Sequence, residues 1–216
     1  MSQHSRTLAI LAFGVTVAVS GLALTRQVIA VAGEADVERL RGAILEYVAR
    51  KNPYAPISAF RGFPETLLME AQRSNLDHCL ALAWAEVESE FRHDAVGAAG
   101  EIGLFQILPT TAAIFEPKLG PFRRPHPSRV KQDLGDLSDP VVSTRFAMAY
   151  IRDIMMRKPT IREALTEYNG GPRGRHPHYY RMVMGAYFEV LDYAQLRCRL
   201  REAPKEPRQL TFLTRA

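Results

Sequence analysis

Three glutamates alternate along one apolar segment, and they are the residues of this chain best suited to acid–base chemistry. Glu86, Glu88 and Glu90 belong to the segment Ala-Glu-Val-Glu-Ser-Glu-Phe, which follows an almost uncharged stretch. A carboxyl group held in apolar surroundings resists ionisation and stays protonated near neutral pH. A general acid needs that property. The segment therefore predicts acid-catalysed bond cleavage.

The glutamates are predicted to lie on a helix over residues 78–92, with Asp77 as its N-cap. The helix is apolar almost all round, and such a helix is normally buried at the centre of a domain. Its main apolar stripe consists of Leu80, Ala83, Trp84, Val87 and Phe91. At about 100° per residue, Glu88 and Glu90 flank this stripe on opposite sides, whereas Glu86 points away. Periodicity alone does not choose between Glu88 and Glu90.

The elements around this helix are also predicted to be helical. Periodic apolar residues predict helices over 35–50, 64–73, 104–115 (with a break at Pro109), 141–158, 161–168 and 179–201. Segments rich in glycine, proline and charge predict a loop over 94–103 and a long surface loop over 116–140. No strand or hairpin pattern is present. The sequence predicts a compact all-α domain of several short helices around one buried helix.

An uncharged apolar run over residues 7–24 comes before the predicted domain. The run is longer than the roughly 7–15 residues of a secretory apolar region and fits the roughly 17–25 residues of a membrane span. An Ala-Val-Ala sequence at 30–32 would serve as a cleavage site. Arg6 and Arg26 nearly cancel, so charge bias barely orients the run. We expect export, through either a cleaved signal peptide or a retained membrane anchor.

The composition is that of a globular protein with a mild basic excess. The chain has 216 residues, 47% hydrophobic and 24% charged, which suits one domain with its own core. Residues 1–32 contain two arginines and no acid, so the remainder has 26 basic and 23 acidic side chains, a net charge of +3. This excess suits an anionic polymer without requiring one. No basic run is interleaved with aromatic residues, so nucleic-acid binding is not expected.

The two cysteines, Cys79 and Cys198, lie far apart in the sequence. In an exported protein they could form a disulfide. Two separate buried thiols is the simpler interpretation and the one we expect. No cysteine and histidine spacing resembles a zinc site, so we expect neither a metal nor another cofactor.

Three motifs, in the right order, resemble one known family. Residues 88–91, Glu-Ser-Glu-Phe, look like the E-S-x-F signature of the soluble lytic transglycosylase-like domain, which is related to goose-type lysozyme. Residues 95–112 are similar to its pattern A-V-x-x-x-G-x-x-G-L-M-Q-I-M-P-x-T-A. Residues 168–172, Tyr-Asn-Gly-Gly-Pro, resemble its A-Y-N-A-G-P block, and 179–183 look like the helix that closes that block. The resemblance covers about 64–191, and three ordered motifs are far more specific than one.

The resemblance implies roles for the matching positions. Glu88 would be the sole catalytic residue, acting first as acid and then as base. Gln106, Tyr168 and Asn169 would line a sugar cleft, with Tyr168 near the Glu88 carboxyl group. The backbone around Phe105 would contact the glycan. The full expected substrate-binding set is Ser89, Gly103, Leu104, Phe105, Gln106, Tyr168 and Asn169.

The resemblance also implies a fold and an activity. The fold would be a lysozyme-like catalytic domain over 33–202, between a signal peptide or membrane anchor over 1–32 and a polar tail over 203–216. The activity would be that of a periplasmic lytic transglycosylase, which cleaves the MurNAc-β-1,4-GlcNAc bond of peptidoglycan strands and forms 1,6-anhydroMurNAc. Small anchored enzymes of this kind often open the wall for secretion systems, flagella, pili or phage, so such a machine is a candidate partner. The alternatives are a hydrolytic lysozyme and a non-catalytic glycan-binding component of an envelope-spanning machine.

Four positions depart from the family pattern. Gly97 stands where serine is frequent, so any hydroxyl contact there is lost. Glu101 and Glu167 stand where alanine is frequent, and Ile102 replaces a residue that is commonly polar or small. The two glutamates would alter pH dependence or substrate contacts if they faced the cleft. For Glu101 we expect exposure at the surface instead.

Overall fold

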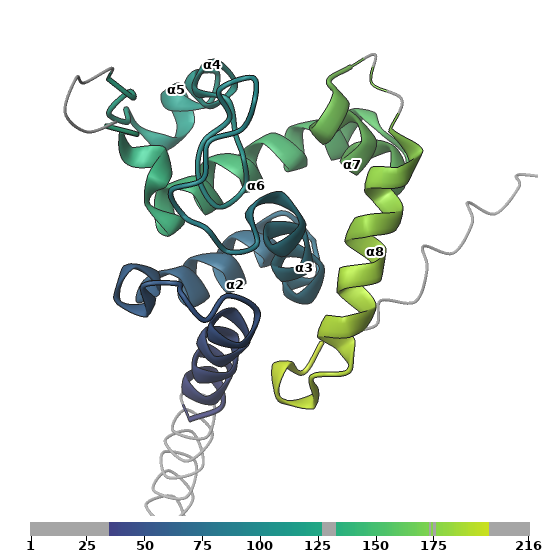
Figure 1. Ribbon diagram of the computed structural model, residues 1–216. Helices are drawn as coiled ribbons and strands as arrows, with labels where there is room; N and C mark the ends of the chain where they lie inside the picture. The colour runs from purple at the N-terminus through teal and green to yellow at the C-terminus, as the bar shows by residue number, and fades with distance from the viewer. Residues whose placement is uncertain (1–34, 127–132, 173, 175, 199–216) are drawn as a thin grey trace, which may run out of the picture. The chain divides into compact units, whose positions relative to one another are not determined.

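The computed structural model describes residues 35–126, 133–172, 174 and 176–198 (Figure 1). The chain divides into two units between Gly42 and Ala43. The described part of the first unit is the beginning of a helix over residues 35–51. The elements of the second unit, all helical, are η1 Ile57–Phe60, α2 Phe63–Arg73, α3 His78–Ser89, α4 Pro109–Ala113, α5 Glu116–Leu119, η2 Asp136–Ser138, α6 Pro140–Arg157, α7 Ile161–Gly170, α8 Pro177–Leu191 and η3 Ala194–Leu196. The all-α prediction is confirmed.

Helix α3 is the buried central helix of the second unit (Figure 1). Every side chain from Cys79 to Ala85 is buried. The helix packs most extensively against α8 and also contacts α2. The Asp77 side chain accepts a hydrogen bond from the Cys79 backbone N–H at 3.1 Å, which satisfies a donor at the helix start. The predicted cap and the predicted central helix are both present.

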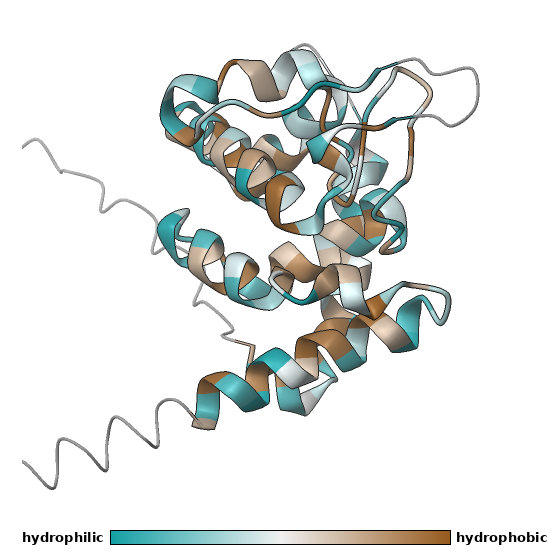
Figure 2. Ribbon diagram, turned by 90° about the vertical axis from the view of Figure 1, so that its left-hand side faces the viewer, coloured by the Kyte–Doolittle hydropathy of each residue, from teal (hydrophilic) through white to brown (hydrophobic). Residues whose placement is uncertain are grey.

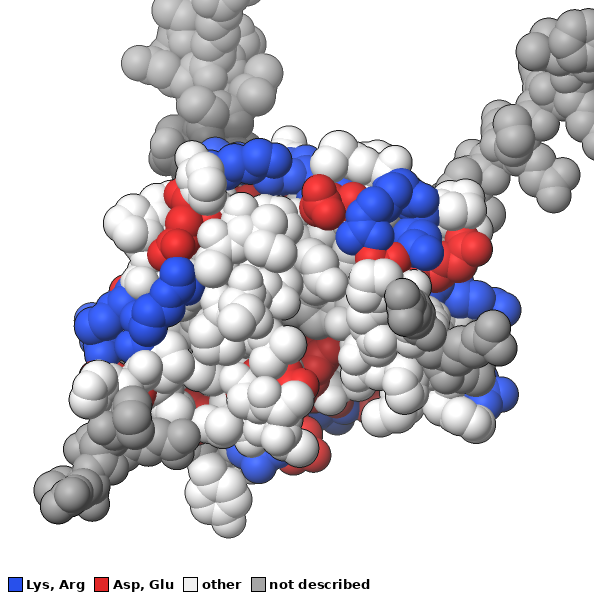
Figure 3. Space-filling model, turned by 90° about the horizontal axis from the view of Figure 1, so that it is seen from above, with Lys and Arg blue, Asp and Glu red and all other residues white. Residues whose placement is uncertain are grey.

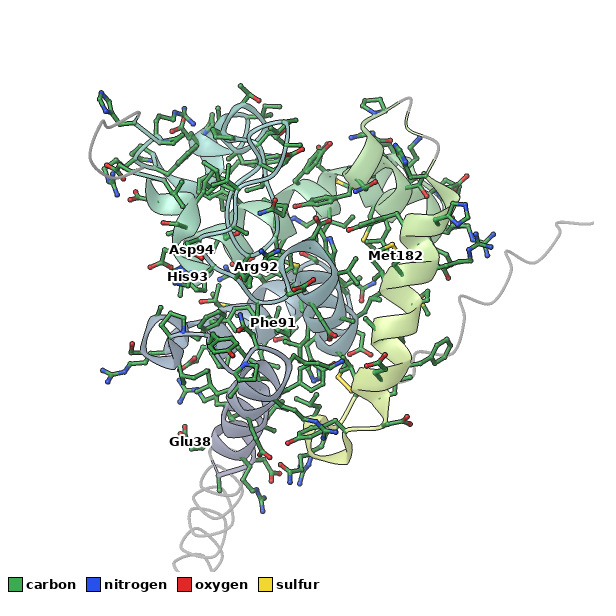
Figure 4. All side chains as sticks on the ribbon, viewed as in Figure 1. Glu38, Phe91, Arg92, His93, Asp94 and Met182 are labelled. Atoms are coloured by element: carbon green, nitrogen blue, oxygen red, sulfur yellow. A yellow bond between two sulfur atoms is a disulfide. The ribbon has the colours of Figure 1, made fainter. Side chains whose placement is uncertain are left out.

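Helix α3 ends at Ser89 rather than at residue 92. Glu90 and Phe91 have φ angles of 51° and 57°, in the left-handed region that ends a right-handed helix. The turn sends the Phe91 ring back into the core, where it meets the Tyr47 ring edge-on at 6.1 Å (Figure 4). Glu90 becomes the C-cap residue and is exposed. It is therefore no longer in helical register with Glu88.

The other helices of the second unit enclose α3 by pairwise packing. Helix α2 contacts α6, α6 contacts α7, and α7 contacts α8. The longer helices are amphipathic, with apolar residues concentrated along one side (Figure 2). A second apolar cluster lies beneath the loops that face α6, and includes Ile102, Ile107, Phe115, Phe122, Leu137 and Phe146. This cluster fixes the loops that form one wall of the site described below.

Two predicted loop and helix boundaries are wrong near this cluster. The segment predicted as a helix from Leu104 is a pair of tight turns, with isolated bridges joining Val96 to Ile102 and Ile102 to Ile107. Helical structure begins only at Pro109, whose fixed φ suits the first position of a helix. The predicted surface loop over 116–140 starts with α5 and, where described, carries buried residues of the second cluster.

A disulfide joins Cys79 on α3 to Cys198, across a sequence separation of 119 residues. The expectation of two separate thiols is therefore wrong. The pairing fits an oxidising compartment. Closing so long a loop restricts the unfolded chain, which stabilises a domain by typically about 2–4 kcal/mol. The bond ties the segment after α8 to the central helix.

The remaining helices agree with the sequence except at one end. Thr160 caps α7 by accepting a hydrogen bond from the Glu163 N–H at 3.2 Å. Helix α8 ends at Leu191 rather than at residue 201. Within the part of the chain that the structure describes, no helix is long and apolar enough to cross a membrane. The apolar run over 7–24 and the tail over 203–216 lie outside the described residues, so the predicted domain limits remain predictions.

Candidate active site

Glu88 lies where two cavities meet on the second unit. The larger cavity, of about 550 Å³, extends along the loop that contains Gly97 and Glu101. The smaller one, of about 340 Å³, extends along α8, where Met182 is one of its lining residues (Figure 4). Asn169 also lines both cavities. A carboxyl group thus stands midway along a groove that continues on both sides of it.

Two hydrogen-bond donors converge on one oxygen of Glu88. The Tyr179 hydroxyl donates a hydrogen bond to Oε1. The Trp84 indole Nε1–H donates to the same oxygen at 3.3 Å. Among the described residues, none donates to Oε2. The two carboxyl oxygens are therefore distinct, one held by the protein and one left for a ligand.

The surroundings of Glu88 shift its pKa into the neutral range, so that a large fraction of the carboxyl group is protonated near pH 7. Burial raises its pKa to about 7, because a charged carboxylate is poorly solvated there. The hydrogen bonds from Tyr179 and Trp84 lower the pKa and offset part of this rise. The negative charge of Glu101 raises it further. The sequence predicted an acid of this kind, and the predicted cause, burial, is the largest one.

Tyr179 and Tyr168 are both held as neutral phenols beside this acid. Burial, followed by the charge of Glu88, raises the pKa of each hydroxyl well above its ordinary value. The Tyr179 hydroxyl is therefore a stable donor to Glu88. The Tyr168 hydroxyl instead donates to the Phe105 carbonyl oxygen at 2.8 Å. Tyr168 lies in the neighbourhood of Glu88, but it is Tyr179 that forms the hydrogen bond.

The Trp84 ring links the acid to the loop on the far side of the cavity. It packs edge-on against the Tyr168 ring at 4.4 Å and against the Phe105 ring at 4.9 Å. Tyr150 extends this cluster by contacting Tyr168 at 5.3 Å. Aromatic contacts of this geometry add to the stabilisation from buried area. The cluster fixes the position of the indole that donates to Glu88.

The structure places the predicted substrate-binding residues in two groups. Gln106, Tyr168 and Asn169 line the larger cavity together with Glu88. The other four do not line it and are buried behind its wall, namely Ser89, Gly103, Leu104 and Phe105. The motif therefore contains cavity-lining residues and residues that support them.

The buried group explains why the loop has this sequence. The Ser89 hydroxyl lies 2.9 Å from the Leu104 carbonyl oxygen and 3.2 Å from that of Ala85, so it connects α3 to the loop. Gly103 has a φ of 79°, and a Cβ there would lie 2.0 Å from the Leu137 carbonyl oxygen. Only glycine fits that position. These contacts hold the loop against α3 and against Leu137.

Sequence reasoning missed several residues that the fold brings to the site. The sequence placed Tyr179 only in the predicted helix that follows the third motif. Tyr168 was expected beside the Glu88 carboxyl group instead. The contact of Tyr179 with Glu88 depends on the packing of α8 against α3, for which the local sequence gives no signal. Glu101 was expected at the surface, yet it lines the larger cavity with Glu88. Tyr150 and Thr111 also line it. Thr111 belongs to the matched pattern over 95–112 but was assigned no role, and Tyr150 had no sequence signal.

The neighbouring acidic residues have other partners. Glu86 accepts a hydrogen bond from the Tyr47 hydroxyl at 2.7 Å and pairs with the Lys51 ammonium at 2.7 Å, away from both cavities. The group of described residues with metal-ligand chemistry, Asp77, His78 and Cys79, is engaged elsewhere, because Cys79 is in the disulfide and Asp77 caps α3. Unlike Glu86, Glu88 forms no salt bridge with a described cation.

A family model described as the transglycosylase SLT domain matches residues 65–179. The chain belongs to this family. The matched range of the SLT domain contains Glu88, the loop with Gln106, the Tyr168–Asn169 pair and Tyr179. Membership of the family agrees with the lysozyme-like all-α fold expected from the sequence.

Two solved structures are similar to this SLT domain protein at low identity. An inactive mutant of lytic transglycosylase Slt from Pseudomonas aeruginosa aligns with a TM-score of 0.41 and 24% identity, covering 63% of this chain and 24% of that chain. The 70 kDa soluble lytic transglycosylase Slt70 from Escherichia coli aligns with a TM-score of 0.40 and 18% identity, covering 64% and 22%. The chain thus spans about a quarter of the length of these structures. A comparison with curated proteins gave no match.

Proposed function

We propose that this protein is a peptidoglycan lytic transglycosylase that cleaves the MurNAc-β-1,4-GlcNAc bond and forms 1,6-anhydroMurNAc. The observation that carries the proposal is Glu88, a carboxyl group with a pKa of about 7 in a groove open on both sides of it. A groove on both sides suits a polymer bound across the acid. Membership of the SLT domain family supports the same substrate class.

The hydrogen bonds of Glu88 indicate which oxygen delivers the proton. Oε1 accepts from both Tyr179 and Trp84, so in the neutral acid the proton is on Oε2. From Oε2 the proton passes to the glycosidic oxygen as the bond to C1 of MurNAc breaks. The leaving GlcNAc hydroxyl keeps the bonding electron pair, and an oxocarbenium-like charge develops at C1. The substrate's own N-acetyl group is suited to stabilise that charge.

The second half of the reaction uses the same carboxylate as a base. Glu88 removes the proton from the C6 hydroxyl of MurNAc, and that oxygen attacks C1. The proton from the C6 hydroxyl replaces the one that left with the GlcNAc hydroxyl, so Glu88 is protonated again and the cycle closes without consuming water. A pKa near 7 suits both halves, because acid and base forms are then both accessible. Tyr179 and Trp84 stabilise the carboxylate form between the two steps.

One observation favours a second candidate, a hydrolytic muramidase. Glu101 provides a second carboxylate in the same cavity, and glycosidases with two carboxyl groups use one to activate water or to attack C1. The product would then carry a free reducing end instead of the anhydro ring. The two products differ in mass by one water.

The deciding experiment is digestion of purified sacculi with the wild type and Glu88→Gln, followed by mass spectrometry of the soluble muropeptides. We expect anhydro products from the wild type and none from the variant. Products one water heavier would favour the muramidase. Undiminished release by a folded Glu88→Gln protein would exclude Glu88 as the acid.

We further propose that the protein is exported, because its substrate lies outside the inner membrane. The disulfide between Cys79 and Cys198 is consistent with the periplasm. Retention in the inner membrane and a role in a secretion, flagellar, pilus or phage machine remain predictions from the sequence. Blocking export and following the size of the mature chain would separate cleavage of residues 1–32 from anchoring.

A further inference from the structure

Gly97 and Glu101 face each other across a tight turn in the wall of the larger cavity. The Gly97 N–H donates to the Glu101 backbone oxygen at 2.8 Å, and the Gly100 N–H donates to the Gly97 oxygen at 3.1 Å. These bonds fix residues 97 and 101 as neighbours. Both residues depart from the family pattern expected from the sequence, and the structure brings the two departures into contact.

The absence of a side chain at Gly97 makes room for two oxygen atoms. A Cβ there would lie 2.3 Å from Glu101 Oε2 and 2.8 Å from Gln106 Oε1, closer than real contacts allow. The Gly97 backbone itself is not in the left-handed region, so the need for glycine is one of space. The Ala99 N–H holds Glu101 Oε2 at 3.0 Å, which keeps the carboxylate over Gly97.

The oxygen of Gln106, rather than its nitrogen, belongs on this side. Its Nε2 donates to the carbonyl oxygens of Gly103 at 2.9 Å and Ala95 at 3.2 Å, which uses both N–H groups. Oε1 is left beside the Glu101 carboxylate. No described residue donates to the Gln106 oxygen, and the Glu101 carboxylate accepts only the hydrogen bond from the Ala99 N–H, so both groups can accept further hydrogen bonds. A bound group that only donates hydrogen bonds would suit both.

The charge of the cavity points to the same kind of group. Glu88 and Glu101 are its acidic lining residues, and the described lining contains no lysine, arginine or histidine. No described cation forms a salt bridge with Glu101. Seen from above, acidic atoms lie within a hollow between uncharged surfaces (Figure 3). A partly buried carboxylate without a cation gains most from a positively charged ligand.

We propose that Glu101 is a specificity-determining residue of the cleft, which together with the Gln106 oxygen binds a primary ammonium group carried by the cell-wall polymer. The inference rests on the proposed function, since it assigns a feature of the substrate in the same groove. An ammonium has three donors and no acceptor, which matches the two converging oxygens. Glucosamine residues that have lost their acetyl group carry such an ammonium, and so does a diamino acid in the stem peptide.

A binding measurement tests this inference independently of catalysis. In the Glu88→Gln background, calorimetric titration compares an oligomer of glucosamine, the matching oligomer of N-acetylglucosamine and a stem peptide with a free side-chain amine. We expect one of the two amine ligands to bind about 10-fold more weakly once Glu101→Gln is added, because hydrogen bonds to charged groups are strong. The acetylated oligomer should change little. Whichever amine ligand depends on Glu101 identifies the source of the ammonium.

Two controls test position rather than total charge. Glu90→Gln removes the same charge from an exposed site outside both cavities and should leave the preference intact. Gly97→Ala keeps the charge but forces the Glu101 carboxylate and the Gln106 oxygen to move, so it should weaken amine binding. Thermal unfolding shows whether each variant is folded at the assay temperature.

Activity provides the second readout. Initial rates of muropeptide release are measured on acetylated sacculi and on the same sacculi after partial de-N-acetylation, for the wild type and Glu101→Gln. Equal affinity of both proteins for all three ligands, with an unchanged rate ratio, overturns the inference and leaves the proposed function intact. Selective, Glu101-dependent amine binding by a protein that releases no muropeptides overturns the proposed function and leaves the binding assignment intact.

Discussion

Glu88 and Glu167 are two shielded carboxyl groups whose pKa values move in opposite directions. Burial raises the pKa of Glu88 to about 7, and its partners are the neutral donors Tyr179 and Trp84. Burial also acts to raise the pKa of Glu167, but Arg157 and Lys158 bind its carboxylate and lower the pKa below the ordinary value. Burial alone therefore does not make a catalytic acid. Between these two residues, the contacts with Arg157 and Lys158 account for the opposite direction of the Glu167 pKa shift.

Glu86 supports this conclusion from the same helix as Glu88. It is only two residues away, yet it faces Lys51 and the Tyr47 hydroxyl instead of a cavity. The chain thus supplies cations to Glu86 and Glu167, whereas no described cation pairs with Glu88 or Glu101 in the groove. The lack of a cation, together with burial, distinguishes Glu88, the proposed acid, from Glu86 and Glu167.

The largest expected effect comes from removing the isolated acid. Glu88→Gln keeps an oxygen that can accept from Tyr179 and Trp84, so the fold should persist. Cleavage should fall by about 10²–10⁴-fold or more, the share typical of general acid–base assistance. Muropeptide release measures the loss and circular dichroism checks the fold. Glu90→Gln is the matched control, and a comparable loss in that variant would show that the comparison rests on the wrong glutamate.

Removing the neutral donor should have the next largest effect. Tyr179→Phe deletes the hydrogen bond to Glu88 Oε1, and a hydrogen bond to a charged group corresponds to about 10–100-fold. The charged form of Glu88 loses stabilisation, so its pKa should rise and the decline of activity at high pH should move upward. The dependence of kcat/KM on pH measures both changes. A lower rate with an unmoved pH profile would mean that Tyr179 supports the fold only.

The role of the cations at Glu167 is tested by removing them. Arg157→Met with Lys158→Met removes both cations and leaves a shielded carboxylate unpaired. We expect a loss of about 1–3 kcal/mol at neutral pH, below the full effect of breaking a buried pair because Arg157 is 45% exposed. In the wild type the lowered pKa stabilises the fold above the unfolded value, and this contribution is lost as pH falls through the folded pKa.

In the double variant the pKa of Glu167 should be raised instead, so stability is lost as pH rises. The difference between wild type and variant should therefore widen from acidic to neutral pH in denaturant unfolding. Arg61→Met, which removes a cation from an exposed position, is the control for charge alone. A difference that does not change with pH would contradict the assigned role of the two cations.

Much of the fold could be predicted because it depends on local signals. The Asp77 and Thr160 caps and the apolar stripe of α3 are encoded within a few residues of where they act. The end of α3 was missed because two non-glycine residues, Glu90 and Phe91, adopt a left-handed conformation to place a ring in the core. The turns after Gly103 were missed because bridges between Ile102 and its neighbours override an apparently helical spacing.

The site was predicted less completely, because several of its contacts join residues that are far apart in the sequence. Glu88 could be chosen from motif order, and its burial from periodicity. Tyr179 comes from a helix far along the chain, so its hydrogen bond depends on how α8 packs on α3. Glu101 reaches the cavity because Gly97 leaves space for it, which is a property of a turn rather than of either residue alone. The disulfide, too, depends on tertiary packing across 119 residues.

The smallest expected effect tests whether charge inside the groove tunes the isolated acid. Glu101 raises the pKa of Glu88, but it is the last of the causes. Glu101→Gln should therefore lower that pKa slightly. Because the reaction needs Glu88 protonated, activity on acetylated sacculi should begin to fall at a lower pH than in the wild type. The shift is opposite in sign to that of Tyr179→Phe. Glu101→Gln removes a charge that disfavours the Glu88 carboxylate, whereas Tyr179→Phe removes a donor that favours it.

Glu86→Gln offers the matched control, because its charge is already balanced by Lys51 outside the groove. A pH profile that moves equally in Glu101→Gln and Glu86→Gln would mean that the acid responds to the charge of the whole domain, and that its isolation in the groove is incomplete.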